Sequence, residues 1–304
     1  TRKESSAASD VYKRQDQEAA ALSRSLNIDI AVDLKGFTKD GRLGLFAERC
    51  APIQVSYLGY PGTTGADYMD YVIADEIVIP LDKQRFFTEK PVYMPHSYQV
   101  NNSQRAISAR QFTRTELGLP ENAFVFCCFN NNYKILPDTF DSWMRILQAV
   151  PGSVLWLFKD NEAAADNLRS EAERRGVHAD RLVFASRLPA DEHLARHSAA
   201  DLFLDTLPYN AHTTASDALW AGLPVLTLAG QSFAARVAAS LLTAVNLDSL
   251  IRGRRGKNTK PRPFILQTTE KPSPPTVHSC KCNASRRLSS TESDSPMTWR
   301  PRIA

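Results

Sequence analysis

A histidine and two threonines stand together where a buried strand is expected to lead into a helix. The segment begins at Leu204 and reads LDTLPYNAHTTASDALW. The apolar residues around its start predict a strand over 202–205, and the apolar spacing toward its end predicts a helix over 213–220. We therefore expect a polar, exposed bend between the two elements.

Such a bend is suited to bind a phosphate, because the first amides of a helix have no partner within it and carry partial positive charge. Thr213 and Thr214 stand at these positions with His212 beside them, so the three are candidate ligands of a diphosphate. Asp217, about one turn later, is a candidate partner for a ribose hydroxyl. The alternative is that one threonine only caps the helix and that His212 is a solvated loop residue.

A second polar turn, LGYPGTTG over 58–65, follows a strand expected over 54–58. Glycine and proline shape tight turns, and glycine lets a backbone amide come close to a ligand. The place directly after a strand favours a binding turn, but a turn of this composition also serves as a plain connection. The residues alone leave both interpretations open.

Strands and helices are expected to alternate strictly from residue 123 onward. The expected strands cover 123–129, 154–158, 182–185, 202–205 and 224–228, and the expected helices cover 137–150, 162–175, 190–198, 213–220 and 233–244. This alternation predicts a parallel sheet with helices on both faces, a Rossmann-like α/β domain. Ligands of such sheets bind at the carboxyl ends of the strands, where the polar bend after the fourth strand falls.

The section before residue 123 is less regular. Its expected elements are strands over 28–32, 54–58, 71–74 and 91–94 and a short helix over 41–49. Polar residues over 99–111 predict a linker between this section and the regular domain. The length of 304 residues allows two ordinary domains.

The two ends of the chain differ in composition from the rest. Residues 252–304 contain 12 Lys or Arg and 3 Asp or Glu, and periodicity stops after Leu250, so we expect a disordered basic tail over 251–304. The abrupt change indicates a shift of reading frame, and residues 1–15 are interpreted as a non-native or disordered leader. The tail has no aromatic pattern for base stacking, so we expect no specific nucleic-acid partner.

Cysteine usage and hydropathy indicate a cytoplasmic protein. Cys50, Cys127 and Cys128 lie in apolar or mixed surroundings, as expected of free thiols in a reducing compartment, while Cys280 and Cys282 have no second pair to complete a zinc site. No apolar run reaches the roughly 20 residues that span a bilayer, and the N-terminus lacks the apolar core of a signal peptide. We therefore expect no membrane partner.

Several segments together resemble the catalytic region of one enzyme family. They read DLKGFTKDGR, APIQVSYLGYPGTTGADYMDYVIAD, NNNYKILP, SVLWLF, and LDTLPYNAHTTASDALWAGLPVLTL followed by RVAAS. In order and spacing, over about 16–250, they resemble the protein O-linked N-acetylglucosamine transferases, glycosyltransferase family 41, which include the plant SPINDLY proteins. The resemblance implies a GT-B type fold of two Rossmann-like lobes. Residues 16–104 are then the latter part of an incomplete first lobe, and 105–250 the nucleotide-sugar-binding lobe.

The resemblance also implies roles for single positions. Lys134 matches the lysine that contacts the donor diphosphate, which makes it the expected catalytic residue, because a fixed cation stabilises the charge on leaving UDP. His212, Thr213 and Thr214 match the diphosphate turn, and Asp217 matches the ribose ligand. The other donor-binding positions that it implies are Asn131, Tyr133, Leu188, His193, Arg196, Leu58, Gly59 and Pro61.

The implied reaction is inverting transfer of N-acetylglucosamine from UDP-N-acetylglucosamine to serine or threonine hydroxyls of proteins. The resemblance requires no metal, and residues 16–250 contain no Asp-x-Asp motif. Members usually carry tetratricopeptide repeats, and their early histidine loop lies upstream of the matched region. We therefore expect weak or absent transfer by the chain alone.

Two alternatives remain open at this stage. Ala190 stands where the family has a lysine near the uridine, which leaves room for a SPINDLY-type protein O-fucosyltransferase that uses GDP-fucose. The other alternative is a nucleotide-sugar-binding pseudoenzyme, which keeps the diphosphate turn and Lys134 but transfers no sugar.

Overall fold

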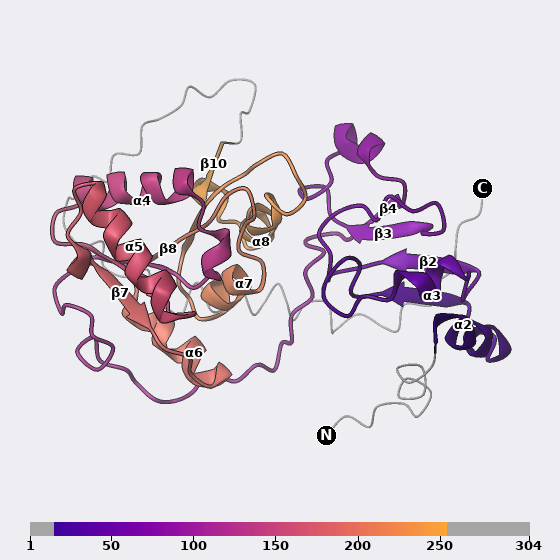
Figure 1. The fold of residues 1–304 in the computed structure, drawn as a ribbon, viewed down its shortest axis with the longest axis horizontal. Coiled ribbons are helices and arrows are strands. Elements are labelled where there is room, and N and C mark those ends of the chain that lie inside the picture. The colour runs from indigo at the N-terminus through magenta and orange to yellow at the C-terminus, as the bar shows by residue number, and fades with distance from the viewer. Residues whose placement is uncertain (1–14, 254–304) are drawn as a thin grey trace. The chain divides into compact units, whose positions relative to one another are not determined.

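The computed structural model describes residues 15–253, which form two compact units. Residues up to Val100 together with Ser232–Ala234 form the first unit, and the remaining residues from Asn101 onward form the second. Each unit contains a parallel sheet with helices packed against it (Figure 1). The expected α/β fold with two Rossmann-like parts is therefore confirmed.

The two chain ends that stand out in the sequence lie almost wholly outside the described residues. Of the expected leader only residue 15 is described, and of the expected basic tail only residues 251–253. Ile251–Arg252 form a short strand, so regular structure continues two residues beyond the expected end at Leu250. Both residues pair with β9 (Val225–Leu228), and a strand of two residues is too short to give a periodic signal.

The first unit is built on a four-stranded parallel sheet in the order β1-β2-β3-β4. Its elements are α2 (Asp16–Ser25), β1 (Ile30–Asp33), α3 (Leu43–Ala47), β2 (Ile53–Ser56), β3 (Tyr71–Ala74), the 3₁₀ helix η1 (Leu81–Phe86) and β4 (Lys90–Tyr93). Helices α2 and α3 pack on each other at one side of the sheet (Figure 1). Helix α2 was not expected from the sequence, because it buries only Ala19 and Ala20 and so shows a weak apolar pattern.

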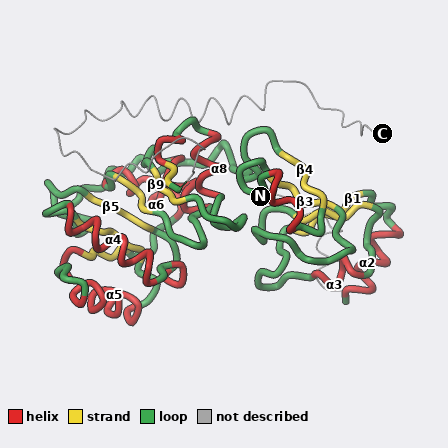
Figure 2. The backbone as a smooth tube through the Cα atoms, turned by 90° about the horizontal axis from the view of Figure 1, so that it is seen from above, coloured by secondary structure: helices red, strands yellow, loops and turns green. Residues whose placement is uncertain are grey.

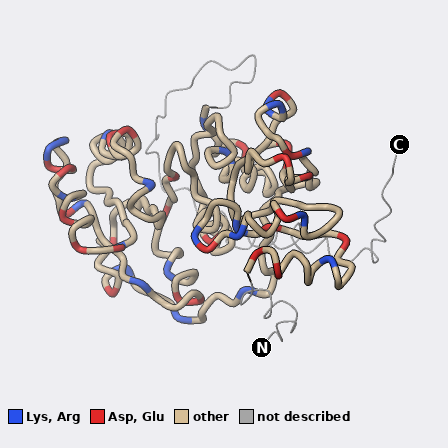
Figure 3. The backbone as a smooth tube through the Cα atoms, turned by 45° about the vertical axis from the view of Figure 1, so that its right-hand side comes forward, with Lys and Arg blue, Asp and Glu red and all other residues tan. Residues whose placement is uncertain are grey.

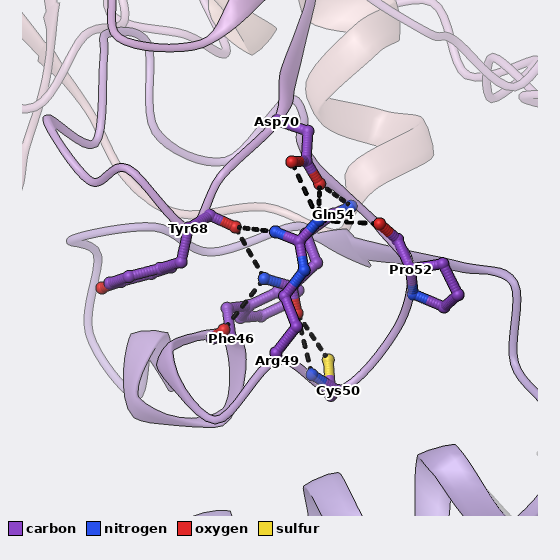
Figure 4. Close-up of polar contacts among 7 residues, drawn as sticks. All are labelled: Phe46, Arg49, Cys50, Pro52, Gln54, Tyr68 and Asp70. Carbon is purple, nitrogen blue, oxygen red and sulfur yellow. Dashed lines mark hydrogen bonds and ion pairs between the residues drawn. The ribbon is translucent and has the colours of Figure 1, made fainter.

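A buried glutamine ties α3 to the sheet of the first unit. Gln54 on β2 is fully buried, and its Nε2 donates to the carbonyls of Phe46 at 2.9 Å and Tyr68 at 2.7 Å. Arg49, at the end of the α3 segment, donates to both carboxylate oxygens of Asp70 at 2.9 Å (Figure 4). The loop before β3 is thereby joined to α3 and to β2 by side chains that satisfy otherwise unpaired carbonyls.

The second unit is a six-stranded parallel sheet in the order β10-β9-β8-β5-β6-β7. Its strands are β5 (Val125–Cys128), β6 (Val154–Phe158), β7 (Leu182–Ala185), β8 (Leu202–Leu204), β9 (Val225–Leu228) and β10 (Ile251–Arg252). The chain runs outward from β5 to β7, and then outward on the other side from β8 to β10. The direction therefore reverses between β5 and β8, which is the topological switch point where such sheets bind ligands.

Helices cover both faces of this sheet. They are α4 (Pro137–Ala149), α5 (Glu162–Arg174), α6 (Ala190–Arg196), α7 (Thr213–Trp220) and α8 (Val237–Ala244), with the 3₁₀ turns η2 (Asn132–Lys134), η3 (Ala179–Arg181), η4 (His197–Ala199) and η5 (Asp248–Leu250). Figure 2 shows α4 and α5 on one side of the strands and α8 on the other. All four side chains of β5 are buried, as expected of a central parallel strand covered on both faces.

Two helices of the second unit differ from their expected bounds by two residues or more. Helix α8 begins at Val237 instead of residue 233, because Ser232–Ala234 leave the second unit and belong to the first. Helix α6 ends at Arg196, and the expected continuation to residue 198 is a 3₁₀ turn. In both places the apolar pattern is longer than the α-helix, extending before the start of α8 and beyond the end of α6.

Charges of both signs are interspersed along the described chain (Figure 3). On α5, Arg169 pairs with Asp166 and Arg174 pairs with Glu171 at a spacing of three residues. Such exposed pairs contribute little to stability and mark a solvated helix face. No helix among residues 15–253 is long and apolar enough to cross a membrane.

Candidate functional site

The loop after β5 and the turn after β8 lie at the same edge of the second sheet, because these two strands pair in parallel. Asn130, at the start of the first loop, joins them. Its Nδ2 donates to Thr206 Oγ1 at 2.8 Å, and its Oδ1 accepts a hydrogen bond from the hydroxyl of Thr214. Asn130 is 1% exposed, so the two loops and the start of α7 are joined by a buried amide.

Lys134 reaches the turn after β8 from η2. Its Nζ donates to the carbonyl of Asn210 at 3.1 Å and lies 4.2 Å from the centre of the Tyr209 ring. The Tyr209 ring in turn stacks on the ring of His212, with centres 4.7 Å apart and planes at 22°. The structure thus brings the expected catalytic lysine to the expected diphosphate turn.

The electrostatics around Lys134 are set by burial and by one carboxylate. Burial lowers the pKa of Lys134, and electrostatic interaction with Asp205 and Cys128 acts in the opposite direction. Burial raises the pKa of Asp205 to about 7, although hydrogen bonds from Thr227 and from two backbone amides favour its charged form. A lysine whose pKa is lowered and a carboxyl group whose pKa is raised therefore lie at the carboxyl end of β8.

Helix α7 begins as expected, at Thr213. Its N-cap residue is His212, so the interpretation that one of the threonines is the N-cap residue is wrong. The Thr214 hydroxyl donates to Asn130. The donors at the start of α7 that have no partner within the helix are therefore its first backbone amides. These amides lie on the same turn as the Tyr209 and His212 rings.

Asp217, the expected ribose ligand, is paired within the second unit. Arg105 Nη1 lies 2.5 Å from Asp217 Oδ1, and the Arg105 carbonyl accepts a hydrogen bond from Trp220 Nε1 at 3.3 Å. The stretch expected as a linker over 99–111 therefore contacts α7 through Arg105. A long-range ion pair of this kind leaves no periodic signal in the sequence.

His193 and Arg196 form a buried cluster beneath the end of β5. Arg196 is 1% exposed, donates to the carbonyl of Ser186 at 2.6 Å, and places its guanidinium 4.8 Å from the ring centre of Phe129. Arg196 Nη2 also lies 2.6 Å from His193 Nδ1. Because arginine only donates, His193 accepts at Nδ1 and carries its proton on Nε2.

Burial also governs the charge of this cluster. It lowers the pKa of His193 to about 3, with the neighbouring His197 and Arg196 acting in the same direction. His193 is therefore neutral at pH 7, and its ring lies 5.2 Å from that of Phe129, next to the loop that carries Lys134. Arg196 acts on His193 from the interior, whereas His193 itself is only partly buried.

The remaining expected donor positions of the second unit lie nearer to solvent. Asn131 is exposed, and Tyr133 is 73% exposed, with the two side chains 3.5 Å apart at their polar ends. Leu188 is partly buried in the loop between β7 and α6. The structure therefore brings Lys134, His212 and Thr214 together, and leaves Tyr133 at the surface of η2.

The expected turn of the first unit is tightly built. Leu58 has a φ of +67°, and a Cβ on Gly59 would lie 2.0 Å from the carbonyl oxygen of Leu34. Pro61 follows in the same turn, which Glu89 fixes by accepting from Thr64 N at 2.6 Å. The turn follows β2 at the carboxyl end of that strand, as expected.

Sequence reasoning missed Asn130, Tyr209 and Asp205 as members of the site. Asp205 offered the clearest signal, since it is an acidic residue directly after a buried strand and directly before the polar turn. Asn130 likewise stands shortly after a buried strand, at the start of the loop that carries Lys134. Among residues 15–253 no group of three or more His, Cys, Asp or Glu side chains is arranged to hold a metal ion.

Comparison with known proteins gives a consistent result. The family model described as Glycosyl transferase family 41 matches residues 3–111 and 107–260. The chain is 41% identical over 243 residues to the probable UDP-N-acetylglucosamine–peptide N-acetylglucosaminyltransferase SEC of Arabidopsis thaliana, covering 78% of this chain and 25% of that protein. It is 35% identical over 248 residues to the probable UDP-N-acetylglucosamine–peptide N-acetylglucosaminyltransferase SPINDLY of Oryza sativa subsp. japonica. This match covers 80% of this chain and 26% of that protein.

One solved structure is also similar. A mutant of the O-GlcNAc transferase of Thermobaculum terrenum superposes with a TM-score of 0.74 and 30% sequence identity, covering 93% of this chain and 52% of that one. The chain therefore spans about a quarter of the length of the curated relatives and about half of the solved one.

Proposed function

The chain belongs to glycosyl transferase family 41, and on this basis we propose that it carries the donor-binding part of a protein O-linked N-acetylglucosamine transferase. In the proposed reaction an acceptor serine or threonine hydroxyl attacks the anomeric carbon of UDP-N-acetylglucosamine from the face opposite the diphosphate. The bond from that carbon to the diphosphate oxygen breaks, UDP leaves with the electron pair, and the hydroxyl proton is released.

The observation that carries this proposal is the meeting of Lys134 with the turn after β8. The ammonium group, 3.1 Å from the Asn210 carbonyl, stands at the same turn as the first amides of α7. Charge on the leaving diphosphate develops as the sugar bond breaks, and a fixed cation together with oriented amides stabilises that charge. Lys134 is the proposed catalytic residue, and His212, Thr213 and Thr214 are the proposed diphosphate ligands.

The base and the ribose have proposed partners in the same unit. His193 is neutral and carries its proton on Nε2, so it can donate to a carbonyl oxygen of the base, and Arg196 holds the ring in place. Asp217 can accept from a ribose hydroxyl with its carboxylate beside Arg105. Leu188 is proposed to line the base site.

Three further parts of the proposal concern residues outside this cluster. Asn131 and Tyr133 are proposed to contact the donor from η2, and the turn with Leu58, Gly59 and Pro61 to face the sugar. The positive charge of Lys134 and of the α7 amides supports donor binding without a metal cofactor. The buried free thiols of the described chain agree with a reducing, cytoplasmic location.

Calorimetric titration of the full chain with UDP and with GDP tests the proposal. We expect UDP to bind more tightly than GDP, and Lys134→Ala to weaken UDP binding by about tenfold or more, because a charge-assisted contact is lost. Lys83→Ala is the matched control, since Lys83 also lies over an aromatic ring, 5.6 Å from the centre of Phe86, but in the first unit.

The other outcomes of the titration are equally informative. Preference for GDP would replace the proposed donor by GDP-fucose, the alternative for which Ala190 leaves room. Tight UDP binding without sugar transfer to a serine peptide would support a nucleotide-sugar-binding module. Absence of binding to either nucleotide would contradict a donor site in this chain.

A further inference from the structure

Asp205, which the proposed reaction leaves without a role, is an acidic residue directly after β8 and directly before the turn of the proposed diphosphate site. It follows the last residue of that strand and is partly buried. One carboxylate oxygen, Oδ1, accepts from the backbone amides of Thr206 at 2.7 Å and Ala211 at 2.6 Å. The other, Oδ2, accepts from the hydroxyl of Thr227 on β9 at 2.6 Å.

These three hydrogen bonds close a loop of the main chain. Thr206 and Ala211 are the first and last residues of the turn, so a single oxygen atom holds its two ends together. Thr227 fixes the same carboxyl group to the neighbouring strand. The turn is further stiffened by Asn210, whose Nδ2 donates to the Thr206 carbonyl at 2.8 Å.

The turn that Asp205 closes presents the partners of Lys134. The Asn210 carbonyl accepts from Lys134 Nζ, and the Tyr209 ring lies beneath the same ammonium group. The residue after Ala211 is the N-cap of α7. A shift of this turn would therefore move the lysine and the first amides of the helix together.

We propose that Asp205 is a positioning residue for the donor diphosphate, holding the 206–211 turn in place while its negative charge opposes the incoming diphosphate. This inference rests on the proposed function and describes how protonation regulates the same site. A neutral carboxyl group serves both needs at once, since the turn stays closed and the repulsion is removed. Nucleotide binding is then coupled to uptake of a proton by Asp205.

Both ionisation states of Asp205 fit the surrounding donors. The Thr227 hydroxyl can donate to a carboxylate or accept from a carboxylic acid, so protonation keeps all three hydrogen bonds. The pKa of Asp205 is raised to about 7 by burial, which places the change of charge in the physiological range. The titratable groups that interact with it are Lys134 and Cys128, on the β5 side.

The other face of the carboxyl group adjoins a cavity of the second unit. Asp205, Thr206 and Thr227 contribute to the lining of this cavity, whose volume is about 1080 Å³. Its charged lining residues are Asp138, Arg145, Arg252 and Asp205 itself. Neutral hydrogen-bond donors therefore come from the turn and from β9, a neutral thiol comes from β5, and charged neighbours come from η2 and the cavity wall.

Asp205→Asn separates the charge from the geometry. An asparagine has the same shape, and its amide oxygen can accept from the two backbone amides while its nitrogen donates to the Thr227 hydroxyl. Asp205→Ala removes all three hydrogen bonds. The first variant is thus the conservative replacement that rescues a positioning role, and the second is the disruptive one.

The test is the dissociation constant of UDP for the full chain and both variants, measured between pH 6 and pH 8. If the nucleotide raises the pKa of Asp205 by one unit, the wild-type constant rises about fivefold from pH 6 to pH 8 relative to Asp205→Asn. Titration of the nucleotide and of other groups is common to both proteins and cancels in the ratio. Asp205→Ala is expected to bind about tenfold or more weakly at both pH values.

Parallel pH profiles of wild type and Asp205→Asn would overturn the charge effect, and wild-type affinity in a folded Asp205→Ala would overturn the positioning role. Hydrogen exchange without nucleotide gives a second readout. We expect the amide of Ala211 to exchange faster in Asp205→Ala and at the wild-type rate in Asp205→Asn. If the wild type binds no nucleotide, the proposed function fails, while equal exchange in all three proteins would refute the positioning role by itself.

Discussion

The buried histidine His197 should make the second unit sensitive to acid. Its side chain is 1% exposed, and its Nδ1 lies 2.7 Å from the carbonyl oxygen of His193. Its ring packs edge-on against Phe129, with centres 5.1 Å apart. Burial lowers the pKa of His197 to about 4, whereas an unfolded histidine titrates near 6.5. Folding therefore favours the neutral ring.

The sign and size of the effect follow from linkage. A group whose pKa is depressed by folding contributes its full stability above the unfolded pKa, and this contribution is lost as the pH falls toward the folded pKa. Between pH 7.5 and pH 5.0 the loss for His197 is about 2 kcal/mol of unfolding free energy. Asp205 acts with the opposite sign, because its pKa is raised, so stability increases as the pH falls through about 7.

Replacement of His197 by phenylalanine isolates this effect. Phenylalanine keeps an aromatic ring against Phe129 but does not titrate, and Asp205 is unchanged in the variant. Urea unfolding of the full chain and of His197→Phe at both pH values should show that the variant loses about 2 kcal/mol less than the wild type. Fluorescence suits the assay, since Trp143, Trp156 and Trp220 are all in the second unit.

A matched control uses an exposed histidine of the same unit. The side chain of His178 is 74% exposed and lies 2.6 Å from Asp180, and exposed pairs contribute little to stability, so His178→Phe should unfold with nearly the same free energy as the wild type at each pH. Equal losses in wild type and His197→Phe would refute the reasoning that a buried neutral histidine limits acid stability. A larger loss in the variant would refute it more strongly.

Two further substitutions test the turns of the candidate site. Gly59→Ala places a Cβ 2.0 Å from the carbonyl oxygen of Leu34, so the first unit should lose about 1–3 kcal/mol, and an unchanged melting curve would contradict the tight turn. Thr214→Val removes the hydroxyl that donates to Asn130 and should weaken UDP binding about fivefold in calorimetry. Thr243→Val, which removes an exposed hydroxyl contact to Asp248 at 2.8 Å, should leave the affinity for UDP unchanged. An equal loss of affinity in both variants would contradict the proposed role of the Thr214 hydroxyl in UDP binding.

Much of the second unit could be predicted from the sequence, because its strands are buried on both faces. The strands over 154–158 and 182–185 and the helix over 213–220 have the expected bounds. Continuous apolar runs and strict alternation with helices give a strong signal for such a sheet. Helix α2 and the two-residue strand β10 could not be found in this way, because one buries too little and the other is too short.

The candidate site was predictable in its local parts only. The turn with His212 and Thr214 follows a strand and opens a helix, which a linear pattern can show. The contact of Asp205 with Thr227 depends on which strand lies beside β8, and no spacing in the sequence gives that neighbour. The pairing of Arg105 with Asp217 likewise joins two positions of the second unit that are 112 residues apart in the sequence, so the polar stretch by itself predicts only a linker.

Binding of a donor diphosphate where Lys134 meets the start of α7 can be followed by amide chemical shifts during titration with UDP. We expect the largest changes at Thr213, Thr214 and Ala215, and we expect Lys134→Ala to reduce them. Large changes confined to the first unit, or to residues around α4, would contradict the assigned site even if UDP binds tightly.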